Sequence, residues 1–145
     1  MTAQHGARTT ESGRQIDLDR AECLRLLGKG IVGRVVFTDR ALPAAHPVTY
    51  LLDGEEVVFR TAGGGKLSAA RRHNVLAFQI DEIDLGTSSG WSVLGIGECY
   101  EVVDQDRLAD LALRLPPAWA ATARDGHVIA IPMQSLTGRR VLAGA

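Results

Sequence analysis

The sequence has 145 residues, a length typical of one domain. It is 46% hydrophobic and 23% charged, which favours a globular chain over a largely disordered one. Sixteen basic residues against seventeen acidic ones give a net charge of -1 at pH 7, so no overall positive field attracts nucleic acid. No run of about 18 apolar residues is present to span a bilayer. We therefore expect neither a nucleic-acid-binding protein nor a membrane protein.

Residues 1–16 are polar, small and mixed in charge, and we expect them to form a flexible N-terminal tail. They contain no apolar stretch of the kind found in a secretory signal, so a cytoplasmic location is expected. Residues 17–145 are expected to form the single domain. Cys23 and Cys99 lie far apart and form no CxxC pair, which favours two buried free thiols over a disulfide.

The domain is predicted to begin with a helix over residues 19–28. Asp19 and Glu22 have the spacing of a capping box, in which two side chains satisfy the free amides of the first turn. Apolar residues recur at helical spacing after this cap. Gly28 and Gly30 then indicate the end of the helix.

Three predicted strands follow. Residues 31–38 are rich in β-branched side chains and lie between turn formers. Residues 46–52 and 55–61 form two further β-rich runs, joined by Asp53 and Gly54. An Asp-Gly pair accepts the positive φ angles of a two-residue turn, so these runs are predicted to form a hairpin.

The second half of the chain is predicted to hold two short helices and further strands. Gly95 and Gly97 lie inside a long β-rich run and indicate a bend or bulge, where backbone or a ligand approaches closely. The predicted elements are a glycine-rich loop over 62–66, a helix over 67–72, strands over 74–81 and 91–103, a helix over 104–115 and short strands over 128–131 and 138–142.

The helices do not alternate regularly with the strands, which disfavours a doubly wound parallel sheet. Most strands follow one another in hairpin-like order. Closing an antiparallel sheet into a barrel removes its exposed edges. We therefore expect a mainly β fold, a six- to seven-stranded antiparallel barrel with two or three short helices.

A segment without acidic residues, Val57 to Ile80, contains four basic ones. The glycines before Lys66 leave the backbone free to turn its amides inward, and Lys66 lies at the start of a predicted helix. Thr61 adds a hydroxyl donor at the end of the preceding strand. This pattern suits a phosphate, and it suits a flexible loop followed by a solvated basic helix equally well.

Other known sites are not indicated. Arg60 and Leu67 occupy the places where a Walker A loop requires a glycine and a hydroxyl residue, so a triphosphate with magnesium is not expected. The histidines show no metal-ligand spacing, and no metal is expected. No GxSxG elbow is present. The sequence therefore identifies no catalytic residue.

The order and spacing of six segments carry a family resemblance. The segments are ECLRLL (22–27), GRVVF (33–37), HPVTY (46–50), VVFRTAGGGK (57–66), GWSVLGIGE (90–98) and TGRRV (137–141). Together they resemble the pyridoxamine 5'-phosphate oxidase-like family, and more narrowly its short actinobacterial-type, flavin-binding split-barrel members. The likeness covers residues 19–142.

The resemblance implies a split β-barrel that forms a homodimer, with flavin mononucleotide (FMN) bound in clefts between the subunits. It implies an FMN-dependent oxidoreductase that transfers hydride to or from a small organic substrate. Related split barrels use a deazaflavin coenzyme or bind haem, and both alternatives remain open here, as does a non-catalytic flavin- or haem-binding protein. Vitamin B6 oxidation is not expected, because no counterpart of the C-terminal substrate-phosphate segment is found.

The resemblance also implies ten cofactor-binding residues, matched by position. They are Pro47, Val48 and Thr49 beside the flavin ring, Arg60, Thr61 and Lys66 near the ribityl phosphate, Trp91 and Ser92 from the partner subunit, and Arg139 and Arg140 closing the site. The chain departs from the family at Gly65, where an arginine or a serine often stands. That change would weaken phosphate binding or make room for a larger group.

Overall fold

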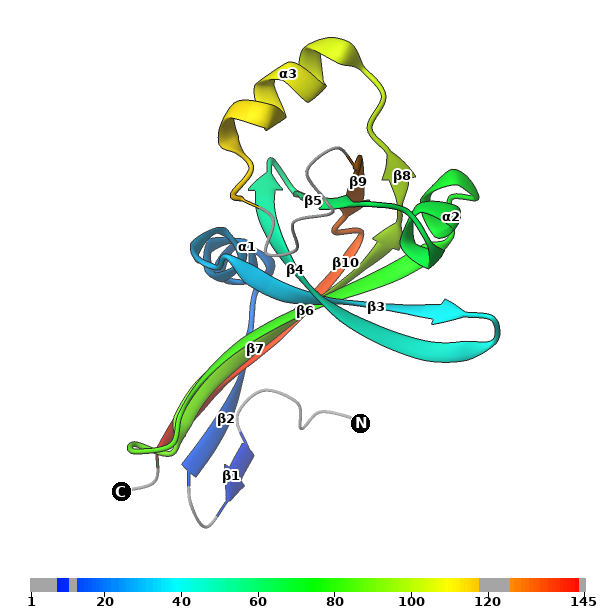
Figure 1. The fold of residues 1–145 in the computed structure, drawn as a ribbon. Helices are drawn as coiled ribbons and strands as arrows, with labels where there is room; N and C mark the ends of the chain where they lie inside the picture. The colour runs from blue at the N-terminus through cyan, green and yellow to red at the C-terminus, as the bar shows by residue number, and fades with distance from the viewer. Residues whose placement is uncertain (1–7, 11–12, 118–125, 144–145) are drawn as a thin grey trace.

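The computed structural model describes residues 8–10, 13–117 and 126–143. Within them ten strands form one sheet in the order β1-β2-β10-β7-β6-β3-β4-β5-β9-β8, and all neighbours are antiparallel (Figure 1). The expected antiparallel split-barrel fold is confirmed, with more strands than the six or seven predicted. The strands are β1 Arg8–Thr10, β2 Gly13–Leu18, β3 Val32–Asp39, β4 Leu42–Asp53, β5 Glu56–Thr61, β6 Val75–Asp84, β7 Ser89–Glu98, β8 Tyr100–Glu101, β9 His127–Pro132 and β10 Ser135–Ala143, and the helices are α1 Arg20–Lys29, α2 Gly65–Arg71 and α3 Gln105–Arg114.

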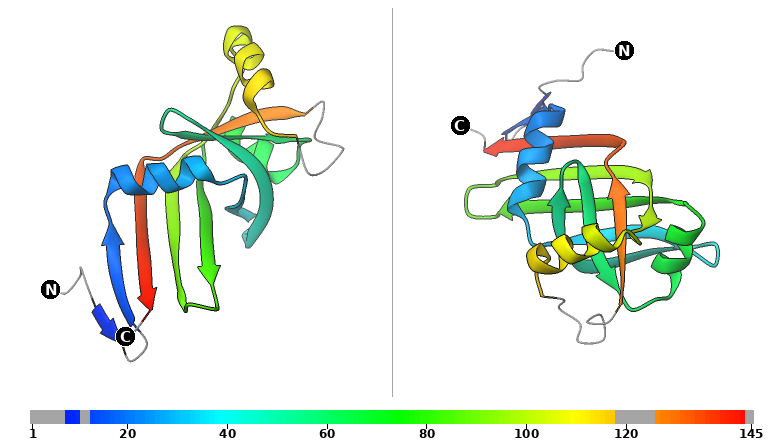
Figure 2. Two further views of the ribbon diagram at one scale, coloured as in Figure 1. Left: turned by 90° about the vertical axis from the view of Figure 1, so that its left-hand side faces the viewer. Right: turned by 90° about the horizontal axis from the view of Figure 1, so that it is seen from above.

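The sheet folds over on itself at β4. The first part of β4 pairs with β3, and its last residues pair with β5. The strands β5, β9 and β8 therefore lie across the layer formed by β2, β10, β7, β6 and β3 (Figure 2). The main core fills the space between the two layers, where Phe59 and Phe78 are fully buried. The two cysteines are free and buried, as predicted.

Both long helices begin at an aspartate cap, and for α1 this cap is the one predicted. Asp19 accepts a hydrogen bond from the backbone N–H of Glu22 at 2.9 Å, and Asp104 accepts one from the N–H of Arg107 at 2.9 Å. The Glu22 side chain accepts hydrogen bonds from Arg25 and Arg140. The reciprocal half of the predicted capping box therefore does not form. Among the described residues, no helix is long and apolar enough to cross a membrane.

The structure corrects three predicted boundaries. β2 begins at Gly13, inside the segment expected to be a flexible tail, and pairs with β10. β4 begins at Leu42 and not at residue 46, because Arg40 and Ala41 form a two-residue turn with positive φ angles of 53° and 65°. The long strand predicted over 91–103 is divided into β7 and β8. Residues 1–7 and 11–12 of the predicted tail lie outside the described residues.

The close approach predicted at Gly95 and Gly97 is confirmed. A Cβ atom built on Gly95 would lie 2.0 Å from Sδ of Met133, and one on Gly97 would lie 1.8 Å from the carbonyl oxygen of Pro132. Glycine is required at Gly97, because the backbone at the end of β9 lies directly over β7 there, whereas at Gly95 the space is taken by the side chain of Met133.

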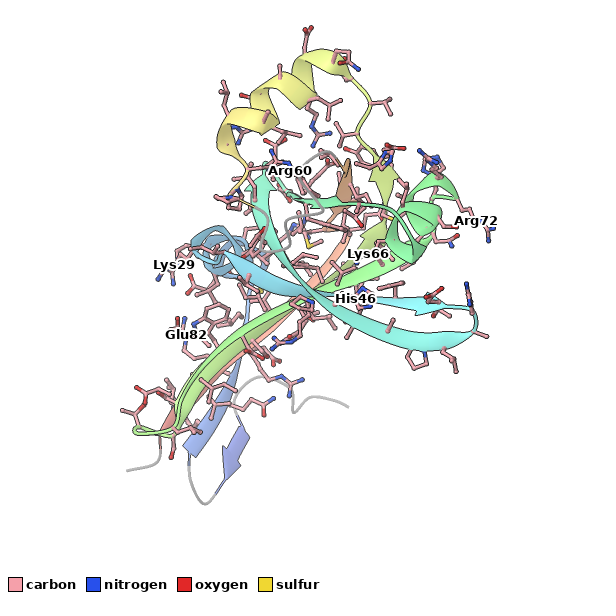
Figure 3. The ribbon with its side chains drawn as sticks, viewed as in Figure 1. Lys29, His46, Arg60, Lys66, Arg72 and Glu82 are labelled. Carbon is pink, nitrogen blue, oxygen red and sulfur yellow. The ribbon has the colours of Figure 1, made fainter. Side chains whose placement is uncertain are left out.

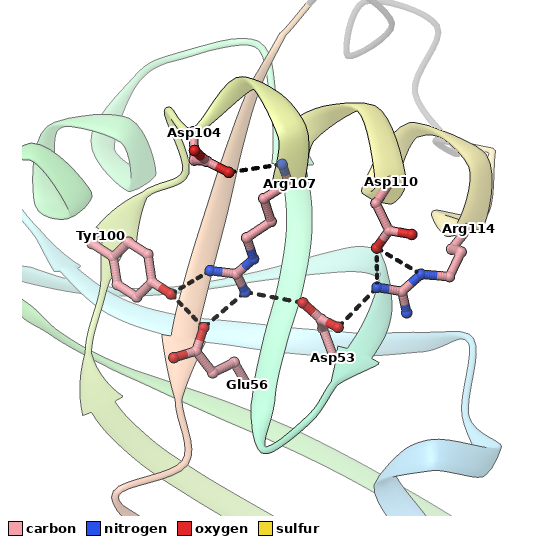
Figure 4. A network of polar contacts seen from close by, with 7 residues as sticks. All are labelled: Asp53, Glu56, Tyr100, Asp104, Arg107, Asp110 and Arg114. Carbon is pink, nitrogen blue, oxygen red and sulfur yellow. Dashed lines mark hydrogen bonds and ion pairs between the residues drawn. The ribbon is translucent and has the colours of Figure 1, made fainter.

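Charged side chains fasten α3 to the hairpin formed by β4 and β5 (Figure 4). Arg107 donates to Asp53 at 3.1 Å and to Glu56 at 2.9 Å, and it also donates to the hydroxyl of Tyr100. Arg114 donates to Asp53 at 2.8 Å. Beneath these ion pairs, a small second core lies between α3 and the sheet, and its fully buried residues include Val58, Ala130 and Leu111. Apolar packing and ion pairs thus fix the same helix.

Candidate functional site

Lys66 is the central cation of the candidate site. It is the second residue of α2, directly after a loop in which Gly63 and Gly64 have positive φ angles of 144° and 80°. Its ammonium nitrogen lies 2.8 Å from Nδ1 of His46 on β4 and 5.7 Å from the centre of the Phe37 ring (Figure 3). Burial lowers the pKa of Lys66. Within the described part of the chain, Lys66 forms no ion pair with a carboxylate.

The structure explains the glycine beside this lysine. A Cβ atom on Gly65 would lie 2.9 Å from Cε2 of Phe37 and 3.3 Å from the carboxyl carbon of Asp39. The Phe37 ring in turn meets the His46 ring edge-on, with 5.0 Å between the ring centres. The space beside Gly65 is therefore filled by Phe37 and Asp39 and is not available to a larger ligand group.

Thr61 and Arg60 lie on opposite faces of β5, because neighbouring residues of a strand alternate. Thr61 is buried, and its hydroxyl donates to the carbonyl of Gly63 at 3.1 Å and accepts from the N–H of Gly63 at 3.4 Å. Arg60 donates to the carbonyl of Pro116 at 3.5 Å, on the side of α3 (Figure 3). Thr61 thus shapes the glycine-rich loop, whereas the described hydrogen bond of Arg60 leads away from Lys66.

Four other predicted residues lie on the solvent-facing side of the sheet, which we call the outer face: Pro47, Thr49, Ser92 and Arg139. This face is defined by the side chains that stand opposite one another at Arg34 and Pro47, at Val32 and Thr49, and at Ser92 and Arg139. Beside Ser92 and Arg139 the sheet has a hollow of about 380 Å³. Its lining includes Asp81, Ile83, Trp91, Ser92, Arg139 and Val141.

Three predicted residues lie on the inner side of the sheet. Val48 is buried in the main core, so only its backbone is available to a ligand. Trp91 packs against the same core, although it also borders the hollow. Arg140, opposite Trp91 in the register, donates to Glu22 on α1 at 3.1 Å. The side chains of Arg139 and Arg140, both predicted to close the cofactor site, therefore lie on opposite sides of the sheet.

Two residues near the predicted site were missed from the sequence. His46 is the first residue of the HPVTY segment, in which only Pro47, Val48 and Thr49 were predicted to bind the cofactor. Its contact with Lys66 joins two elements and has no local signal in the sequence. Arg34 stands on the outer face between Pro47 and Gln79. Only the alternation of residues 33–37 could have indicated that Arg34 faces the same side as Pro47.

Comparison with known proteins identifies the family. Residues 19–140 match the family described as pyridoxamine 5'-phosphate oxidase. The chain belongs to this family. An uncharacterised protein of Mycobacterium tuberculosis is 39% identical over 139 residues, which cover 92% of this chain and 90% of that protein.

Solved structures show that the family fold extends over most of the chain. The FAD binding protein from Mycobacterium smegmatis is 29% identical, with a TM-score of 0.69, over 87% of this chain and 97% of that one. A conserved protein of unknown function from Corynebacterium diphtheriae is 30% identical, with a TM-score of 0.69, over 88% of this chain and 98% of that one. The residues matched to the family, 19–140, include Lys66 and the outer-face residues Pro47, Thr49, Ser92 and Arg139.

Proposed function

We propose that this protein binds FMN between two copies of the chain and acts in the cytoplasm as an oxidoreductase on a small organic substrate. The family match and the similarity to an FAD-binding protein of Mycobacterium smegmatis support a flavin as the cofactor. The half-buried ammonium of Lys66 is the observation that carries the proposal.

The residues around Lys66 fit the phosphate end of FMN. A phosphate carries negative charge and forms its strongest hydrogen bonds with cationic donors. Lys66 offers such a donor, partly removed from water and with no carboxylate partner among the described residues. The loop of Gly63 and Gly64 has no side chains to block an approaching phosphate, and Thr61 holds this loop in shape.

The outer face fits a second copy of the chain. Exposed apolar side chains gather there, and such patches are typical of surfaces that bind another protein. The exposed apolar residues of this face are Val32, Val36, Val75, Ile83, Leu94, Ile96 and Val141.

β4 connects Lys66 with the outer face. His46 contacts Lys66 on one side of this strand, and Pro47 and Thr49 belong to the outer face on the other. Among the described strands, residues 42–49 pair only with β3, so this half of β4 is an edge of the sheet. Its two prolines fit an edge position, because proline has no N–H for a second neighbour. A flavin with its phosphate at Lys66 would reach the face between two copies along this edge.

A bound flavin supplies the hydride transfer itself, and the protein binds and orients it. In this proposal Lys66 holds the phosphate, the backbone of β4 lies along the ring, and Ser92 and Arg139 approach from the partner copy. The second copy covers the outer face and thereby excludes water from the ring.

An absorbance spectrum tests this proposal. The purified chain, incubated with FMN and separated from unbound FMN by gel filtration, should retain the two-banded yellow spectrum of a flavin and elute as a dimer. Retention of FAD alone would change the cofactor and keep the oxidoreductase proposal. A Soret band after incubation with haem, without retention of either flavin, would identify a haem-binding protein. A chain that retains neither would leave the deazaflavin coenzyme as the ligand to titrate.

A further inference from the structure

His46 and Lys66 form a hydrogen-bonded pair from two separate elements, β4 and α2. The nitrogen atoms are 2.8 Å apart. A lysine ammonium only donates hydrogen bonds, so Nδ1 of His46 must accept, and the histidine must then be neutral with its proton on Nε2. The pair therefore holds one positive charge in total when no anion is bound.

Apolar side chains of β3 border the pair. The Phe37 ring packs against both side chains. Val35, the cross-strand neighbour of His46, is apolar and buried. The carboxylate of Asp39 on β3 lies beside Gly65, the residue before Lys66. Among the described residues, Asp39 makes no hydrogen bond or ion pair with His46 or Lys66.

We propose that His46 is the second cation of the phosphate site, and that it takes up a proton when a phosphate monoester binds at Lys66. This proposal rests on the proposed function, because the monoester concerned is that of FMN. A phosphate monoester has its second pKa at about 6, so at pH 7 it is mostly a dianion. The proton, taken from solvent, adds to Nδ1 of His46, so the hydrogen bond with Lys66 is replaced by hydrogen bonds from both cations to the phosphate. One ammonium balances half of the phosphate charge, and the protonated His46 balances the rest.

The same argument makes His46 a specificity-determining residue. Each phosphate in the diphosphate of FAD carries one charge that does not titrate near neutral pH. Such a phosphate is balanced by Lys66 alone and draws no proton onto His46. The site therefore discriminates in favour of FMN over FAD, and this preference grows as the pH falls from 8 towards 6.

Isothermal titration calorimetry in phosphate-free buffers tests the proposal directly. At pH 7.5 the binding heat of FMN is measured in two buffers with different ionisation enthalpies, and the difference gives the protons taken up. The wild-type chain should take up a large fraction of one proton per FMN. With FAD or riboflavin in place of FMN, the uptake should be close to zero. Because this arm uses the wild-type protein, it does not depend on the folding of a variant.

His46→Asn identifies the group that takes up the proton. The amide oxygen of asparagine can still accept from Lys66, but it cannot be protonated. His73→Asn is the matched control, because His73 is exposed and has a positive φ of 55°, which asparagine tolerates. We expect proton uptake to disappear in His46→Asn and to remain in His73→Asn.

The pH dependence of affinity provides a second measurement. In this proposal, the protonated form of His46 stabilises the bound phosphate, so this contribution to binding is present at lower pH and is lost as the pH rises. The Kd of FMN should therefore increase with pH, by up to about tenfold per pH unit. The Kd of His46→Asn should change less. An equal slope in both proteins would assign the titration to Lys66 and overturn the proposal.

The remaining outcomes separate this inference from the function on which it rests. FMN binding without proton uptake overturns the role of His46 and leaves the proposed function standing. Failure of FMN, FAD and riboflavin to bind at all overturns both. Inorganic phosphate probes the site without the ring, and binding as tight as that of FMN would assign the site to free phosphate, against the proposal.

Discussion

Lys66 combines a positive charge with a half-buried position at the start of α2, and in the proposed site it holds the cofactor phosphate. We predict that Lys66→Ala weakens FMN binding by about 1.5–3 kcal/mol, the contribution of a hydrogen bond to a charged group. That loss corresponds to a Kd roughly 10- to 150-fold higher in a fluorescence titration. Lys29→Ala, the same change at an exposed lysine in the last turn of α1, should leave Kd unchanged. Equal affinity of the two variants would remove Lys66 from the site.

Gly97 illustrates how a single missing side chain permits the fold. Gly97→Ala places a Cβ atom 1.8 Å from a carbonyl oxygen of the backbone, so β9 must move away from β7. We expect a loss of about 2 kcal/mol or more in the free energy of unfolding measured with urea. Gly28→Ala is the control. Gly28 lies inside α1, and a Cβ atom there would make an ordinary contact of 3.8 Å with the side chain of Leu52 on β4. That variant should be as stable as the wild type or more stable by up to about 1 kcal/mol.

At the scale of elements, Arg107 determines how firmly α3 is attached to the sheet. Its guanidinium lies between Asp53 and Glu56, and all three side chains are at least two-thirds buried. Arg107→Ala leaves both carboxylates without this partner, so we expect a loss of about 1–3 kcal/mol in the free energy of unfolding. Arg25→Ala removes a more exposed ion pair within α1 and should cost much less. Similar losses in the two variants would contradict the anchoring role.

The attachment of α3 should also weaken in acid. Hydrogen bonds from Arg114 and then Arg107 hold the pKa of Asp53 below its usual value of 3.8. Because the pKa of Asp53 is lower in the folded than in the unfolded chain, Asp53 stabilises the fold at pH values above its pKa in the unfolded chain. This stabilisation is lost as the pH falls through its pKa in the folded chain. Asp53→Asn keeps the turn, because the turn residues are Gly54 and Glu55, whereas Asp53 is the last residue of β4. The wild type should exceed Asp53→Asn in stability at pH 6, and urea unfolding at pH 3 should show a smaller difference.

For the whole molecule, the exposed outer face predicts a dimer. Leu94 lies on this face between Gln79 and Thr137, with 38% of its surface exposed in the single chain. Leu94→Lys should convert the dimer to a monomer and release FMN, because a charge at the centre of an apolar interface is costly. Leu113 is 88% exposed on α3, so Leu113→Lys should sediment like the wild type. A Leu94→Lys dimer with bound FMN would contradict the proposed interface.

The elements that the sequence predicted well are those with local signals. Asp19 caps α1 as expected. The predicted hairpin forms, but its two-residue turn is Gly54 and Glu55, one residue later than the predicted Asp53 and Gly54, and Gly54 has a positive φ of 64°. The turn at Arg40 and Ala41 was missed because neither residue favours a positive φ. β2 was missed because it is held by backbone pairing with β10, which its polar composition does not indicate.

The sequence by itself determined the cap of α1, the presence of the main hairpin, the antiparallel class and the placement of Lys66 at the start of α2, because each depends on residues close together in the chain. Only the tertiary structure decided which predicted residues can meet. Cross-strand register placed Arg139 beside Ser92 and Arg140 beside Trp91, and folding across β4 brought His46 to Lys66, 20 positions away. Such contacts depend on how strands pair and curl over the whole domain, and no local pattern encodes them.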